Sequence, residues 1–276
     1  SILARTCDEQ EFPTLKSDFI FVVDNSGSMS EEQAGLANAA DQFYAALVAS
    51  GLDARLGVVT TDSQVLRGDG FTNDPSVFQD DVQVGIGGNG VEMGLEFAAQ
   101  AVSLADTNAD DARRFRDDAA KVVIVISAED ATNLRSVPDY VDFFNQEGVI
   151  LYAIVGPRPV GCVFVGLGAA RVGESYIDVA QATGGASASI CNPNLAETIA
   201  EILVGAAGAA SKSPLTRTPI SSSLHVDVQG ASIVRSRSDG FDYEASSNTV
   251  LFFGTQPDRG TPIDISYQFF KPLEAG

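Results

Sequence analysis

Residues 18–30 read DFIFVVDNSGSMS, and this stretch says more about the fold than any other part of the chain. The apolar run 19–23 predicts a strand buried on both faces, as in a parallel sheet covered by helices. Asp24, Ser26 and Ser28 follow on a loop, and Ser30 with the two acids after it is a good helix start. The sequence therefore predicts that Asp24, Ser26 and Ser28 lie at the carboxyl end of a sheet, where open α/β folds bind ligands.

The three side chains have the chemistry of a site for a hard cation. One carboxylate and two hydroxyls suit Mg²⁺, which binds few charged ligands and retains water. The Asp24-x-Ser26-x-Ser28 pattern after a first apolar strand resembles the metal-ion-dependent adhesion site of a von Willebrand factor A domain, of a bacterial secreted or surface type. The resemblance implies a doubly wound, mostly parallel sheet that holds Mg²⁺, with Mn²⁺ or Ca²⁺ as alternatives. The competing interpretation is turn chemistry alone, because residues 24–27 all favour turns.

The two other loops of such a site depart from the family pattern. In the family a second loop donates a threonine, but residues 84–95 read VGIGGNGVEMGL and contain none. Asn89 stands nearest the threonine position, and Glu92 is an alternative acid on the same turn. The Gly85-x-Gly87-x-x-Gly90 spacing also matches a dinucleotide fingerprint, but it does not lie on the first strand–helix turn, where such a fingerprint normally occurs.

The third loop of the family carries Thr-Asp where this chain has Ser127-Ala128, so alanine replaces the aspartate. Glu129 and Asp130 follow directly, and we expect them to reach the ion directly or through water. The predicted metal ligands are thus Asp24, Ser26, Ser28, Asn89, Glu129 and Asp130. A site with one fewer direct carboxylate is expected to bind a divalent ion more weakly.

Alternation of apolar strands and helices along residues 18–213 supports the α/β prediction. Strands are expected at 19–23, 54–61, 82–84, 121–127, 149–155 and 186–190, with 82–84 as an antiparallel edge. Apolar residues at helical spacing predict helices over 91–104 and 195–210. Residues 1–17 show no clear periodicity and are expected to form a lead-in arm.

From residue 214 the apolar period changes to two, as in Leu224, Val226 and Val228. Turn signals such as Asp239-Gly240 punctuate this part of the chain. Residues 214–276 are therefore expected to form a small antiparallel β module. Because about 60 residues are marginal for independent folding, the module is expected to pack on the A-like domain or on a partner.

The chain is strongly acidic, with a formal net charge of −20 from 37 acids and 17 bases. Nucleic acid and anionic membranes both require basic patches, so neither is expected as a direct partner. No apolar run approaches the roughly 20 residues of a membrane span. The chain begins at Ser1 rather than Met, which is expected of a processed or truncated start.

Two of the three cysteines, Cys162 and Cys191, follow strands that are expected to be neighbours. A bridge between them would imply an oxidising compartment, so the protein is expected to be extracytoplasmic; the alternative is two buried thiols. Cys7 is left over, either free or paired between chains.

The leading hypothesis is a non-enzymatic, secreted or surface binding protein whose Mg²⁺ receives an acidic group of a protein ligand. The alternative is a structural subunit of a surface assembly or filament with a degenerate metal site, which implies self-assembly. A metal-dependent enzyme built on Asp24 is disfavoured, because aspartate nucleophiles of the haloacid dehalogenase type carry a second aspartate where this chain has Ser26. His225 is the only histidine, which argues against nucleophilic triads.

Overall fold

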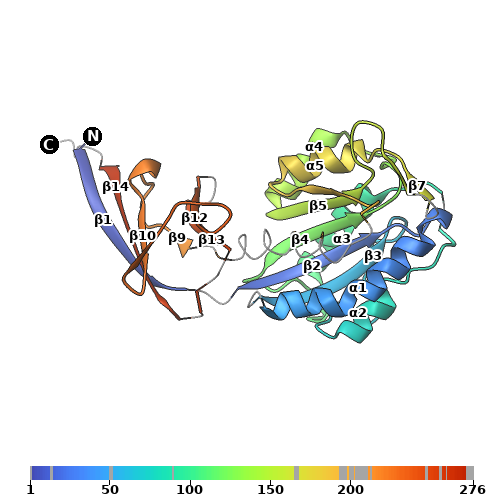
Figure 1. The fold of residues 1–276 in the computed structure, drawn as a ribbon, viewed down its shortest axis with the longest axis horizontal. Helices are drawn as coiled ribbons and strands as arrows, with labels where there is room; N and C mark the ends of the chain where they lie inside the picture. Colours follow the sequence, from blue (N-terminus) through green and yellow to red (C-terminus); the bar gives the residue numbers. More distant parts are fainter. Residues whose placement is uncertain are drawn as a thin grey trace. The chain divides into compact units, whose positions relative to one another are not determined.

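The computed structural model describes residues 2–12, 15–49, 52–88, 90–164, 168–192, 198, 202, 211, 213–245, 248–254, 257–258 and 260–271. The chain divides into two compact units (Figure 1). The A unit holds Lys16–Ala49 and Ala54–Ala206, and the β unit holds Ser1–Leu15, Ser50–Asp53 and Ala207–Gly276. The A unit is therefore an insertion in the β unit, which contributes residues from both ends of the chain.

A five-stranded sheet forms the centre of the A unit, in the order β3-β2-β4-β5-β8. The strands are β2 (Lys16–Val23), β3 (Asp53–Thr60), β4 (Ala120–Ile126), β5 (Val149–Val155) and β8 (Ser187–Ser189). The pairs β2–β4, β4–β5 and β5–β8 are parallel. This is the predicted doubly wound, mostly parallel α/β architecture.

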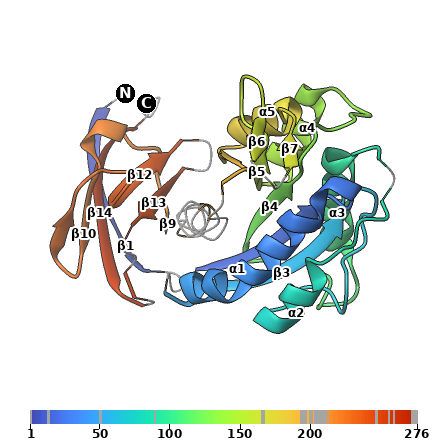
Figure 2. The same ribbon diagram turned by 45° about the vertical axis from the view of Figure 1, so that its right-hand side comes forward.

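Helices cover both faces of this sheet (Figures 1 and 2). They are α1 (Ser30–Ala49), α2 (Pro75–Asp81), α3 (Gly94–Thr107), α4 (Val137–Gln146) and α5 (Glu174–Ala182). A short 3₁₀ turn, η1 (Gly27–Met29), precedes α1, and the small hairpin β6 (Cys162–Phe164) and β7 (Gly168–Ala170) precedes α5. No helix in the described part of the chain is both long and apolar enough to cross a membrane.

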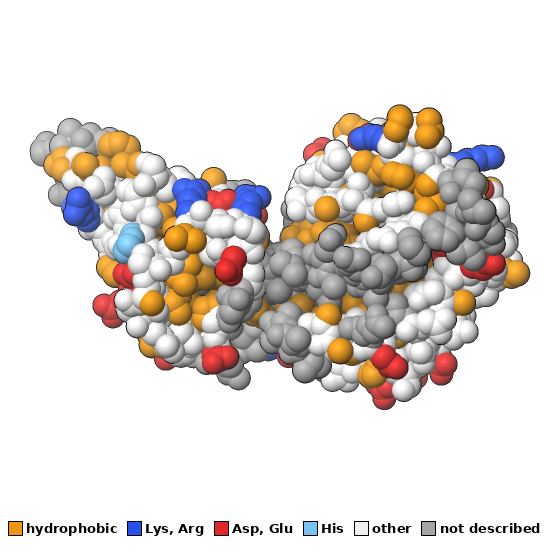
Figure 3. All heavy atoms as spheres, in the orientation of Figure 1, with side chains coloured by type: hydrophobic (Ala, Val, Ile, Leu, Met, Phe, Trp, Pro, Cys, Tyr) orange, Lys and Arg blue, Asp and Glu red, His pale blue; other side chains and the backbone are white. Residues whose placement is uncertain are grey.

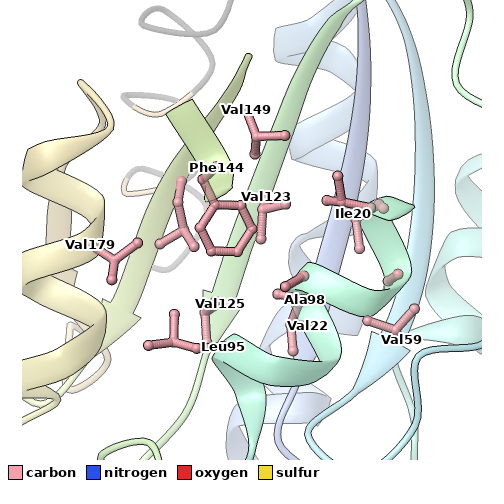
Figure 4. Close-up of a cluster of buried hydrophobic side chains, with 14 of the residues drawn as sticks. Ile20, Val22, Val59, Leu95, Ala98, Val123, Val125, Phe144, Val149 and Val179 are labelled. Atoms are coloured by element: carbon pink, nitrogen blue, oxygen red, sulfur yellow. The ribbon is translucent and has the colours of Figure 1, made fainter. Parts of the chain in front are cut away.

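Residues 19–23 of β2 are all apolar because their side chains are buried in turn on the two faces of the sheet. Ile20 and Val22 belong to a core cluster with residues of α3, α4 and α5 (Figure 4). Phe21 points to the other face, where its ring centroid lies 5.8 Å from Phe43 of α1 and 4.9 Å from Phe78 of α2. A strand covered on both faces cannot alternate apolar with polar residues, which explains the unbroken run in the sequence.

The expected strands agree with the observed ones except at 82–84. Val82 is the C-cap of α2, and residues 83 and 84 lie outside any strand, so the predicted antiparallel edge is wrong. Val82 is fully buried. Val82 is apolar because it packs into the core at the end of a helix. A run of three residues in the sequence does not distinguish such a helix end from a short strand. The helix expected over 91–104 begins later, at Gly94, and the helix expected over 195–210 lies largely outside the described residues.

The β unit contains two small antiparallel sheets, with strand orders β1-β14-β10-β11 and β12-β13-β9. Its strands are β1 (Ile2–Glu11), β9 (Ser213–Pro214), β10 (His225–Val228), β11 (Ala231–Ile233), β12 (Gly240–Glu244), β13 (Thr249–Phe253) and β14 (Pro262–Lys271), with a 3₁₀ turn η2 (Ser221–Ser223). The predicted antiparallel module is thus present. The residues expected to form an arm supply β1, which pairs with β14 over its whole length.

One charged side chain of β1 points into the β unit and is fully satisfied there. Asp8 is 7 % exposed, and its carboxylate accepts hydrogen bonds from the backbone and hydroxyl of Thr216, at 2.9 and 2.6 Å. The hydroxyl of Tyr267 donates a third, at 2.7 Å. These bonds bring β14 and the segment after β9 onto β1, so the first strand is an integral part of the module.

Candidate functional site

Asp24 lies at the carboxyl end of β2 and is fully buried. Its backbone N–H donates to Ile126 at 3.0 Å, which continues the pairing of β2 with β4. The carboxylate accepts from the Ser26 N–H at 2.7 Å and from the Ser127 hydroxyl at 2.7 Å. Among the described residues, both of its oxygens therefore accept from neutral donors.

The two serines of the motif stand beside this carboxylate. Their hydroxyl oxygens are 3.2 Å apart, with Ser26 half-buried and Ser28 exposed. The turn η1 starts directly after Ser26, contains Ser28 and runs into α1. Two adjacent hydroxyls, one open to solvent, lie where they can coordinate the same cation.

The second loop is tied to the first by the side chain of Gln33. Its amide donates to the backbone oxygens of Asp24 and Gly85, at 3.0 and 2.9 Å, and its oxygen accepts from the Gly85 N–H at 3.1 Å. The Gly88 N–H donates to Asn25 at 2.9 Å, and a Cβ at Gly88 would lie 2.5 Å from the Asn25 side-chain oxygen. A side chain at position 88 would therefore have to displace the Asn25 amide. Asn89, the predicted ligand next to it, lies outside the described residues.

Glu92, the alternative acid of the second loop, lies beside Asp24. Its side chain is 4 % exposed, and its Oε2 atom has no hydrogen-bond partner among the described residues. Burial, together with the charges of Asp24 and Glu129, raises the pKa of Glu92 to about 7, although a hydrogen bond with Thr61 acts in the opposite direction. A carboxyl in this position gains from an added positive charge.

The third loop places its predicted acids differently. Ser127 donates to Asp24 and accepts from the Glu129 N–H at 3.2 Å, which holds Glu129 next to the site. The Asp130 carboxylate instead accepts from the N–H and the hydroxyl of Ser175, at 2.9 and 3.3 Å, at the start of α5. Ala128 is buried, and its carbonyl accepts from the Arg171 N–H at 2.8 Å.

Ser127 is the residue that the sequence analysis missed as part of the site. It was noted only for its place in the family pattern, yet its hydroxyl joins Asp24 to the third loop. A serine that follows a buried strand at this edge was the available signal. The structure thus brings Asp24, Ser26, Ser28, Glu92 and Glu129 together, and it engages Asp130 with a helix start.

No arginine or lysine in the described residues pairs with Asp24, Glu92 or Glu129. A buried tyrosine, Tyr176, adds to the polar groups: its hydroxyl has no partner among these residues, and its pKa is raised by burial and then by Asp24, Glu92 and Asp130. The local charge is negative and uncompensated. Elsewhere, on the face drawn in Figure 3, acidic side chains lie scattered rather than in one patch.

The residues present fit a magnesium-type site of low protein charge. The described residues hold no group of three or more His, Cys, Asp and Glu side chains arranged for a metal. The donors are instead two serine hydroxyls and a buried carboxylate with further acids nearby, a set that Mg²⁺ completes with water. The orphaned Glu92 oxygen and the missing counter-charge are what such an ion would satisfy.

A disulfide joins Cys162 of β6 to Cys191, with an S–S distance of 1.99 Å and Cα atoms 6.2 Å apart. The predicted bridge is therefore present, and Cys7 is free and exposed. The hairpin held by the bridge is followed by Arg171, which donates to the third loop at Ala128. The disulfide and the candidate site are thus connected through one backbone hydrogen bond.

No family model and no curated protein matches this chain. Among solved structures, proximal thread matrix protein 1 from the mussel byssus is similar at 14% identity and a TM-score of 0.50, over 76% of this chain and 52% of that protein. This chain therefore spans about half the length of the mussel protein. At this identity the likeness shows the fold alone.

Two bacterial proteins are similar at TM-scores below 0.5, which are too low to support a conclusion about this chain. The pilus adhesin SpaC from Lactobacillus rhamnosus GG has 12% identity and a TM-score of 0.46, over 96% of this chain and 40% of that one. An aerotolerance-related membrane protein from Bacteroides fragilis has 12% identity and a TM-score of 0.43, over 68% of this chain and 98% of that one.

Proposed function

We propose that this chain is a non-enzymatic, extracytoplasmic binding protein that recognises an acidic group of a protein ligand through a divalent cation. The cation is Mg²⁺, with Mn²⁺ or Ca²⁺ as alternatives. It is held by Asp24, Ser26 and Ser28, with Glu129 nearby. Asn89 and Asp130 remain predicted ligands. Asn89 lies outside the described residues, and Asp130 would reach the cation after a rearrangement or through a water molecule.

The observation that carries the proposal is the uncompensated burial of Asp24. A buried carboxylate is normally paired with a base or a metal, because desolvation of an isolated charge is costly. Here the described neighbours are neutral donors and further acids, Glu92 and Glu129. A bound divalent cation would supply the missing positive charge and an open coordination position for an acidic oxygen.

The oxidising environment implied by the Cys162–Cys191 bridge supports the extracytoplasmic part of the proposal. The alternative, a structural subunit with a degenerate site, is favoured by Ala128, which is buried where the family carries an aspartate. The two functions differ in one measurable property, the binding of a divalent cation.

Titration of the purified chain with Mg²⁺ or Mn²⁺ in a calorimeter tests the metal. We expect saturable binding by the unmodified chain and none by Asp24→Asn, with Asp142→Asn on α4 as a control of equal charge change. Acetate then stands in for the acidic group. With Tb³⁺ as a luminescent substitute, acetate is expected to displace bound water, which lengthens the emission lifetime. A chain that binds no divalent ion is the result expected of the structural subunit.

A further inference from the structure

The long edge of the β unit is β1, which has ten residues and pairs with β14 on one side only (Figure 1). The register with β14 runs without a bulge from Ile2 opposite Lys271 to Glu11 opposite Pro262. No other strand in the described part of the chain pairs with β1. The opposite edge of the same sheet is β11, which has three residues. A short edge strand resists pairing, whereas a long regular one is a template for another strand.

The pairing groups at this free edge belong to the odd-numbered residues. In an antiparallel ladder the N–H and C=O of one residue point to the same side of the strand. Phe12 follows β1 in register and donates to Thr261 at 2.8 Å, so the even-numbered residues face β14. The outward-facing groups therefore come from Leu3, Arg5, Cys7, Glu9 and Glu11.

The side chains of these same residues lie on one face of the sheet, and all of them are exposed. In the described residues neither Arg5 nor Glu9 forms a salt bridge. The side chains between them, such as Asp8, turn to the other face, where Asp8 is satisfied by Thr216 and Tyr267. The edge thus combines unpaired backbone groups with charges of both signs that form no ion pair among the described residues.

We propose that β1 pairs with β1 of a second copy of this chain, antiparallel and about a twofold axis through Cys7. In this register Arg5 lies opposite the partner's Glu9, Glu9 lies opposite the partner's Arg5, and Cys7 faces the partner's Cys7. Opposite charges on directly facing residues stabilise an antiparallel pair. The contact is isologous, so it closes as a dimer and joins two four-stranded sheets into one.

Neighbouring registers are worse for identifiable reasons. An axis through Arg5 places two arginines opposite each other, and an axis through Glu9 places two glutamates opposite each other, which is unfavourable. An axis through Thr6 sets Arg5 opposite Cys7 and leaves both charges without partners. An axis through Asp8 sets Arg5 opposite the partner's Glu11, but it leaves Glu9 opposite Cys7 and Leu3 unpaired, because the strand ends at Glu11. The axis through Cys7 combines long overlap with two Arg–Glu pairs.

Charge substitutions at the edge test the pairing. Sedimentation velocity at 150 mM salt is expected to show a monomer–dimer equilibrium between about 1 and about 100 µM, the range of a small interface. Arg5→Glu and Glu9→Arg should each weaken the dimer at least about tenfold, since both symmetric pairs become like-charged. The double variant Arg5→Glu/Glu9→Arg restores both pairs and should return to the original constant.

Asp142→Arg on α4 is the matched control, and it should dimerise like the unmodified chain. Asp24→Asn should also dimerise normally, which separates this inference from the proposed metal site. A chain that stays monomeric at about 100 µM overturns the proposal. So does a dimer unaffected by Arg5→Glu, and so does a double variant that remains as weak as the single ones.

The position of the axis has its own test. Burial and the nearby acids Asp264, Glu9, Asp8 and Asp227 raise the pKa of the Cys7 thiol, so the reaction is run at alkaline pH. Two Cys7 thiolates form one S–S bond, and diamide takes up the two electrons and two protons. We expect rapid cross-linking of the unmodified chain and much slower cross-linking of Arg5→Glu. Cys7→Ser should still dimerise without a cross-link, and cross-linking at equal rates in both proteins would contradict this register.

Discussion

Two buried aspartates lie near opposite ends of strand β2, and their surroundings differ in sign. Asp18, at the amino end, is fully buried and pairs with Arg55 at 2.7 Å and Arg116 at 2.9 Å. Asp24, at the carboxyl end, is equally buried but is held by neutral donors and lies close to Glu92 and Glu129. One strand therefore carries one compensated and one uncompensated negative charge.

The difference indicates that the two carboxylates serve different purposes. Beside Asp18, Arg55 also donates to the backbone carbonyls of Asp111 and Arg114 in the segment before β4, so the charge pair organises the chain. Around Asp24 no such base is present among the described residues. A buried acid without a counter-charge lowers stability unless a ligand supplies one, so we interpret the amino end as structural and the carboxyl end as the binding end.

The largest expected effect is that of Asp18→Asn on stability. The substitution removes the fully buried carboxylate that Arg55 and Arg116 both contact, which should lower the free energy of unfolding by about 3–5 kcal/mol. Urea denaturation followed by circular dichroism measures the loss. Metal binding by the folded fraction should be unchanged. A loss below about 1 kcal/mol would show that Asp18 does not organise this end.

The second effect concerns metal affinity at Asp24. Asp24→Asn should reduce divalent-ion affinity at least about 100-fold, more than the loss of an outer-shell partner causes. Without metal, its stability should stay within about 1 kcal/mol of the unmodified chain. Saturating Mg²⁺, at about 100 times the dissociation constant, should add about 2.7 kcal/mol to the unmodified chain only. Thermal melts with and without chelator measure this difference. Equal shifts in both proteins would contradict the assignment of Asp24, rather than Asp18, to the binding end of β2.

The third effect depends on pH and concerns Glu92. Its pKa is raised to about 7, above the ordinary 4.5, so the folded protein holds the proton more tightly than the unfolded chain. The charged form therefore lowers stability as the pH rises from about 4.5 to about 7. In chelator, Glu92→Gln should match the unmodified chain at about pH 4 and exceed it by about 1–3 kcal/mol at about pH 8. Urea melts across this range test the sign, and a variant that is less stable at high pH would contradict it.

The smallest effect on stability is expected at an exposed salt bridge near the amino end of β2. Lys16 and Asp118 are 2.6 Å apart, with side chains 28% and 65% exposed. Asp118→Asn should change stability by less than about 1 kcal/mol, since exposed ion pairs are weak. Comparison with Asp18→Asn in the same urea experiment shows how much burial contributes. A loss as large as that of Asp18→Asn would mean that the two pairs act as one network.

The features that the sequence predicted correctly were local. The unbroken apolar run before Asp24 predicted a doubly covered strand, and Ile20 and Phe21 confirm it from opposite faces. The order of strands and helices predicted which ends of the strands share an edge, and this led to the Cys162–Cys191 bridge. Each of these predictions depended on a few neighbouring residues and a general rule of chain topology.

The features it did not predict depend on distant partners. Strand β1 has little apolar periodicity of its own, and its pairing with β14 joins Cys7 to Ser266 across almost the whole chain. Asp130 could reach the site or turn away, and the choice depends on Ser175 of α5. Glu92 could be read as an ordinary helix acid, since its burial beside Asp24 appears only after two loops have met. Long-range geometry decides all three.

The pairing of β1 with β14 also determines when the β unit can be completed during synthesis. Ile2–Glu11 leaves the ribosome about 250 residues ahead of its partner Pro262–Lys271, an interval of about 12–50 s at ordinary translation rates. The inserted A unit has all its strands in that interval and can fold first. Until β14 arrives, β1 lacks the partner strand that it has in the folded β unit, so its pairing groups stay open to other extended segments.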